Sequence, residues 1–139
     1  MLGRYHYPDS SILTRDKINV RDGHYSIWGP VHFYAETNES GQPSLAAGVL
    51  VNRFTVSPLQ TELLATIAES GLVPQCAMNV TRDSEMGPLK AYEPPVPCGC
   101  FFETHVKEGS QPARCKACAG PGDCPSATPA CRYGFCEAR

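Results

Sequence analysis

The sequence predicts an α+β fold: a small antiparallel sheet with one helix at about residues 58–70, followed by a disulfide-rich, loop-dominated C-terminal module. Three observations predict it. One stretch carries the start, face and end signals of a helix. Several stretches rich in aromatic and β-branched residues are typical of strands. Seven of the eight cysteines fall in the last 42 of the 139 residues, among turn-forming glycines and prolines.

The helix at 58–70 is the best-marked element. Ser57 is the expected N-cap, Pro58 occupies the first helical position, and Gln60 completes a Ser-x-x-Gln capping box. Gly71 is expected to end the helix in the left-handed conformation. The expected apolar face consists of Leu59, Leu63, Leu64 and Ile67, and the polar face of Thr61, Glu62, Thr66 and Glu69. One side of this helix should therefore pack on the rest of the body.

The strands are predicted from composition and from turn signals. Residues 17–20 form a short strand candidate, and 25–34 a longer one that is broken at Gly29-Pro30. A turn at 38–41 is expected to join it to a second strand at 46–56. Residues 73–80 are predicted as a further strand that carries Cys76.

An aromatic cluster lies within the longer strand candidate. Aromatic residues in a strand are usually part of the core, so we expect core packing here rather than stacking on a ligand. The cluster consists of Tyr25, Trp28, Phe33 and Tyr34.

The chain divides at a proline-rich connector. Residues 1–93 form the predicted α+β body, 94–97 a stiff connector, and 98–139 a cystine-stapled module docked on the body. The module has little apolar surface, so covalent bonds must supply much of its stability. Each such bond contributes on the order of 3 kcal/mol by restricting the unfolded chain.

The cysteine content indicates an oxidising compartment. Eight cysteines in so short a chain are typical of exported, disulfide-bonded proteins. The first nine residues lack the apolar stretch of a secretory signal, so either the protein stays in the cytosol or a leader has been removed. The cysteines favour export, to an extracellular, periplasmic or outer-surface location, and a lipid anchor could be attached through such a leader.

The last part of the chain resembles a short repeat of known proteins. It contains Asp123-Cys124-Pro125, then Cys131, then Gly134 and Cys136. This pattern, over 118–136, is similar to the "C…DCP…C…G.C" units in secreted proteins and surface lipoproteins of myxobacteria. The resemblance implies an exported protein and carries no catalytic residue; the body resembles no family that we can name.

The resemblance also implies a crossed pairing, Cys118 with Cys131 and Cys124 with Cys136. Four cysteines then remain: Cys76, Cys98, Cys100 and Cys115. A bond between Cys98 and Cys100 would strain the disulfide geometry, so each should pair outward, which leaves two arrangements. We favour Cys76–Cys98, which ties the module to the body, with Cys100–Cys115, which closes a hairpin-like stretch over 101–114.

Zinc is the competing interpretation. Cys98-x-Cys100 and Cys115-x2-Cys118 form two ligand pairs at a zinc-ribbon spacing, with His105 in the loop between them. Four other cysteines would then be left as thiols, which weighs against it. The alternative function is therefore a zinc-stabilised intracellular interaction protein.

Other functions are disfavoured. The formal net charge of −2 offers no field to gather nucleic acid, and no apolar run reaches the roughly 18–20 residues that span a bilayer. Neither a nucleophile elbow nor a phosphate loop is present, and the histidines (His6, His24, His32 and His105) form no ligand pair. We therefore expect no enzyme and no cofactor, but a structural or binding protein with a protein partner or self-assembly.

Overall fold

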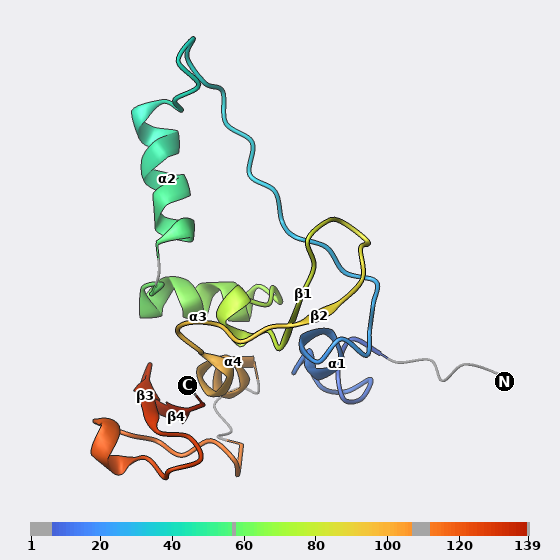
Figure 1. Cartoon of the computed structure of the whole chain (residues 1–139), viewed down its shortest axis with the longest axis vertical. Helices are drawn as coiled ribbons and strands as arrows, with labels where there is room; N and C mark the ends of the chain where they lie inside the picture. Colours follow the sequence, from blue (N-terminus) through green and yellow to red (C-terminus); the bar gives the residue numbers. More distant parts are fainter. Residues whose placement is uncertain (1–6, 57, 107–111, 139) are drawn as a thin grey trace, which may run out of the picture.

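Short helices and two small antiparallel sheets make up the fold, as seen in a computed structural model that describes residues 7–56, 58–106 and 112–138 (Figure 1). The predicted class is confirmed: helices, small antiparallel sheets and a disulfide-rich C-terminal region. The elements in chain order are α1 (Ile18–Arg21), α2 (Leu45–Thr55), α3 (Thr61–Glu69), η1 (Gln75–Ala77), β1 (Val80–Thr81), β2 (Lys90–Ala91), α4 (Gly99–Val106), η2 (Pro121–Asp123), β3 (Ala130–Arg132) and β4 (Phe135–Glu137).

Helix α3 is the predicted helix, with a later start. It begins at Thr61, so Pro58 lies three residues before it, and Gln60 stands at the cap position without a side-chain capping bond. Ser57 lies outside the described residues. Gly71 adopts the expected left-handed φ of +82°, and its N–H donates to the Ala68 carbonyl. The polar face is exposed as predicted.

The hydrophobic core lies where α3 crosses α4 (Figure 1). Its buried residues are Leu64, Ala68, Ala77, Cys98, Phe101 and Phe102. Leu64, Phe102 and Cys98 are completely shielded from solvent. Helix α3 belongs to the predicted body and α4 to the predicted module. Since these helices pack together, the two segments share one core. Burying such side chains contributes about 1.5–3 kcal/mol each.

Helix α4 replaces the hairpin that the sequence predicted over 101–114. Phe101 and Phe102 are buried against α3, and His105 stacks on Phe101 one turn further on, at a ring distance of 3.8 Å. This spacing of three to four residues fits a helix and not a strand. The predicted middle of the hairpin, 108–110, lies outside the described residues.

The two sheets are separate hairpins. β1 pairs with β2, and β3 pairs with β4, where Cys131 lies opposite Cys136. The β3–β4 turn consists of Tyr133 and Gly134, which both have positive φ, as the tight turn between twisted strands requires. The predicted strand 73–80 is wrong over most of its length, because η1 occupies its centre and only Val80 joins a strand.

Residues 24–56, which we call the arm, extend away from the rest of the molecule (Figure 1). The first part is extended, the turn at 38–41 forms as predicted with Gly41 N–H donating to the Asn38 carbonyl, and α2 leads back. The predicted strand at 46–56 is wrong. Ser44 caps α2 by accepting a hydrogen bond from the Ala47 N–H, and leucine and alanine favour a helix.

The remaining strand predictions fail for related reasons. Residues 25–34 are extended but form no ladder among the described residues, because the strand expected to pair with them is α2. Residues 17–20 belong mostly to α1, a single turn that is held by the Asn19 and Val20 N–H groups donating to the Pro8 carbonyl. Among the described residues, no helix is both long and apolar enough to cross a membrane.

Candidate functional site

All eight cysteines form disulfides. The pairs are Cys76–Cys98, Cys100–Cys115, Cys118–Cys131 and Cys124–Cys136. The resemblance implied Cys118–Cys131 and Cys124–Cys136. The other two pairs are the arrangement that we favoured for the remaining four cysteines. No free thiol is left in the chain.

Two disulfides join parts of the core. The Cys76–Cys98 bond connects η1 to the start of α4, and the Cys98 N–H donates to the Cys76 carbonyl at 2.9 Å. The Cys100–Cys115 bond then holds the chain that follows α4 against its first turn. One cysteine of each bond, Cys98 and Cys115, is fully buried, and Cys98 belongs to the hydrophobic core.

The other two disulfides staple the terminal hairpin. Cys118–Cys131 and Cys124–Cys136 cross on β3 and β4, whose Cys131 and Cys136 are paired in register. Asp123 closes the loop between them by accepting hydrogen bonds from the N–H groups of Ala119 and Gly120. These two donors lower the pKa of the exposed Asp123 carboxyl.

The sulfur positions bear on the zinc alternative. Its four cysteines, Cys98, Cys100, Cys115 and Cys118, are distributed over three different disulfides. The sulfur atoms that the described structure does bring together, within 4.8 Å of one another, are those of Cys118, Cys124 and Cys136. Zinc takes thiolate ligands, so either set would bind it only after reduction.

A buried charge cluster, which was not predicted from the sequence, lies next to the first two disulfides. Arg21 Nη1 lies 2.6 Å from Glu103 Oε1, and the Arg21 Nε–H donates to the Ala77 carbonyl at 2.7 Å. The more exposed Arg114 also pairs with Glu103. The guanidinium of Arg21 further lies over the Phe102 ring, 5.4 Å from its centre. The one signal in the sequence was a carboxylate directly after two phenylalanines.

Glu137 completes this cluster from β4. Its carboxylate accepts a hydrogen bond of 2.6 Å from the Cys100 N–H, at the start of α4 where a helix favours an anion. Burial raises the pKa of the Glu137 carboxyl, while the Cys100 N–H and Arg21 act in the opposite direction and Glu103 adds to the rise. Gly99 leaves room for Arg21 beside the start of α4, because a Cβ there would lie 2.9 Å from Arg21 Nη2.

The cluster borders a cavity of about 210 Å³. Two guanidinium groups, Arg21 and Arg114, and three carboxylates, Glu93, Glu103 and Glu137, line it. Glu103 pairs with both arginines, and Glu137 accepts from the Cys100 N–H. The arrangement therefore links α1, α4 and β4.

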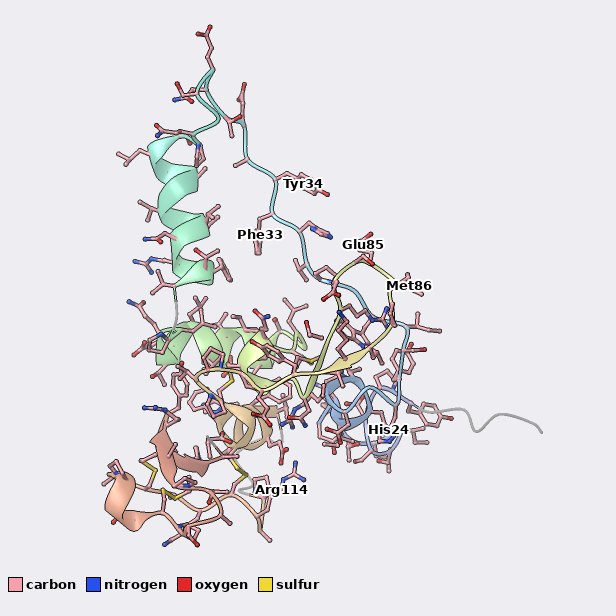
Figure 2. The ribbon with its side chains drawn as sticks, in the orientation of Figure 1. His24, Phe33, Tyr34, Glu85, Met86 and Arg114 are labelled. Atoms are coloured by element: carbon pink, nitrogen blue, oxygen red, sulfur yellow. A yellow bond between two sulfur atoms is a disulfide. The ribbon has the colours of Figure 1, made fainter. Side chains whose placement is uncertain are left out.

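The described histidines lie apart. His32 Nε2 is 2.7 Å from Glu85 Oε1 on the exposed β1–β2 loop, and His105 Nδ1 is 2.8 Å from the Phe101 carbonyl in α4. His24 lies near α1, at the base of the arm, and His6 is outside the described residues (Figure 2).

The aromatic cluster is not a core. Phe33 and Tyr34 are exposed, whereas Trp28 and Tyr25 are half-buried. In Figure 2, Phe33 points toward α2 and Tyr34 points away from it. The expectation of core packing was wrong for the two exposed rings, because the second strand that should have covered them is a helix.

No known protein family, curated protein or solved structure matches this chain.

Proposed function

We propose that this chain is an exported or surface-associated, disulfide-stabilised protein that binds or assembles through its faces and does not act as an enzyme. The observation that carries the proposal is the closure of all eight cysteines in four disulfides. Such bonds form and persist in oxidising compartments, which supports an extracellular, periplasmic or outer-surface location.

The terminal hairpin gives the proposal further support. Its Asp123-Cys124-Pro125 motif and its crossed disulfides agree with the resemblance to the units of secreted proteins and surface lipoproteins of myxobacteria. A lipid anchor on a removed leader is part of the same proposal.

The placement of the charged and the apolar side chains favours binding over catalysis. The buried charges beside the cavity are engaged in the fold: Arg21 pairs with Glu103, and Glu137 accepts a hydrogen bond from the Cys100 N–H. The arm, in contrast, presents large apolar side chains to solvent. Exposed apolar surface of this kind typically marks an interaction site.

Cell fractionation together with intact mass spectrometry tests the proposal. We expect the protein outside the cytosol, with a mass eight hydrogens below that of the reduced chain because four disulfides are closed. A cytosolic protein that has the reduced mass and carries stoichiometric zinc would overturn it in favour of the zinc-stabilised alternative.

A further inference from the structure

The arm, residues 24–56, contributes no buried side chain to the fold. The last buried residue before it is Arg21 and the first after it is Leu64, among the described residues. No helix or strand of the described chain packs extensively against α2. Inside the arm, the Phe33 and Phe54 rings are in contact at 4.9 Å. The apolar side chains of the arm are therefore largely uncovered.

The amount of apolar surface on the arm is unusual for a monomer. Nine of the fourteen large hydrophobic side chains that the described residues leave exposed lie on it: Ile27, Val31, Phe33, Tyr34, Leu45, Val49, Leu50, Val51 and Val56. Summed over all sides of the arm, they expose on the order of 900 Å². For comparison, the largest single apolar patch of a typical monomer is roughly 300–600 Å².

Helix α2 is apolar around most of its circumference. Arg53 is its one charged residue, and Ala46, Ala47 and Gly48 would let another helix approach closely. A helix that is apolar on nearly all sides is normally buried. Since this chain leaves α2 exposed, another surface must cover it.

The arm is held at its base. The Arg82 guanidinium lies over the Trp28 ring, 4.7 Å from its centre, and also donates to the Ser26 carbonyl. His32 contacts Glu85 on the same β1–β2 loop. These contacts fix the direction of the extended segment, which reduces the entropy lost when a partner binds.

We infer that the partner is a second copy of this chain, whose arm packs antiparallel on the first, with α2 against α2. This inference deepens the proposed function and rests on it for the role of the assembly. The exposed apolar area lies on more than one side of the arm and is large enough to supply the apolar part of the roughly 800 Å² that each partner contributes to a standard interface. The two bodies then lie at opposite ends of the paired arms.

The charges of the arm select the antiparallel arrangement. Arg53 lies at the end of α2 nearest the body, whereas Glu39 lies in the turn at the tip. A parallel pair would place Arg53 beside Arg53 and Glu39 beside Glu39. An antiparallel two-fold pair brings the Arg53 of each copy toward the Glu39 of the other, which favours partners of opposite sign.

Analytical ultracentrifugation of the oxidised, full chain tests whether two copies form a dimer through the arm. We expect a dimer at micromolar concentration, and a monomer for the variant with Leu45→Glu and Leu50→Glu. Leu45 lies in the first turn of α2, where glutamate is compatible with the helix dipole, and circular dichroism checks that α2 persists in the double variant. The matched control is Leu13→Glu: Leu13 is 90% exposed against 88% for Leu45 but lies outside the arm, so this variant should stay dimeric.

Charge reversal tests the arrangement. Arg53→Glu alone and Glu39→Arg alone should each weaken the dimer at least tenfold in Kd, because both contacts of the pair become repulsive. An equimolar mixture of the two variants should recover dimers, because both contacts are then attractive again.

A wild-type chain that stays monomeric, or a dimer that the arm variants leave unchanged, would overturn the inference. So would a mixture of the two charge variants that gives no dimer. The oxidation state and the cellular location of the protein do not depend on these results, so the proposed function can fail or hold separately.

Discussion

Arg21 and Glu103 lie 82 residues apart in the sequence, yet Arg21 Nη1 is 2.6 Å from Glu103 Oε1, and both side chains are only about 5% exposed. The pair fastens α1 to α4 and so connects the N-terminal residues to the disulfide-bonded part of the chain.

Removing one member of this pair should destabilise the fold strongly. Glu103→Gln leaves Arg21 buried without its counter-charge, which costs about 3–5 kcal/mol of unfolding free energy. Urea unfolding of the oxidised protein measures it. The control is Asp83→Asn, which breaks the exposed ion pair with Lys90 and should cost less than about 1 kcal/mol. Equal effects of the two changes would contradict a buried pair.

The Cys76–Cys98 bond should stabilise the whole core. Replacing both cysteines by alanine opens a loop with a sequence separation of 22 and should lower the unfolding free energy by about 3 kcal/mol. Thermal or urea unfolding measures the loss, after mass spectrometry has verified that the other three bonds are closed. Unchanged stability would mean that packing alone holds η1 to α4.

Glu137 should make the protein less stable as pH rises. Burial raises the pKa of Glu137 above its ordinary value of 4.5, so the folded state holds this proton more firmly than the unfolded state does. Its contribution is fully present below about pH 4.5 and is lost as the pH rises through the folded pKa. Glu137→Gln should remove this fall from a plot of unfolding free energy against pH.

Asp123 supplies the matched comparison with the opposite sign. The Ala119 and Gly120 N–H groups lower its pKa, so its contribution is present above the ordinary value of 3.8 and is lost as the pH falls through the folded pKa. Asp123→Asn should therefore flatten the acid side of the same plot. Identical pH profiles for the Glu137 and Asp123 variants would contradict both assignments.

Leu64 should be critical for the core. It is completely buried between α3 and α4, so Leu64→Ala leaves a cavity and should cost about 2–5 kcal/mol of unfolding free energy. Leu13→Ala, at a leucine that is 90% exposed, should change it by less than about 0.5 kcal/mol. A small effect at Leu64 would place the core elsewhere.

The features that the sequence predicted well are local or covalent. The end of α3 followed from Gly71, because left-handed backbone there favours glycine. The resemblance implied the two crossed disulfides, and the short spacing of Cys98 and Cys100 left two arrangements for the other four cysteines, of which the favoured one forms. The predicted start of α3 was three residues too early. A capping pattern shows that the residue types suit a helix start, but it does not show that the capping hydrogen bonds form.

Three of the failed predictions, at 25–34, 46–56 and 101–114, share one cause. Residues 46–56 and 101–106 contain apolar residues that suit either a strand or a helix, and short apolar runs do not separate the two by periodicity. The Ser44 cap favours a helix over a strand at α2. At α4, the packing of Phe101 and Phe102 on Leu64 favours the helix. Once α2 is helical, residues 25–34 lose their strand partner and remain extended.

The sequence by itself determined the disulfide-rich character, the α+β class and the end of α3, because cysteine spacing and left-handed glycine act over a few residues. Only the tertiary structure decided that Arg21, Glu103 and Glu137 meet, and that the arm stands clear of the core. Such contacts join residues dozens of positions apart. They form through the packing of α1, α4 and β4, and no local pattern in the chain encodes them.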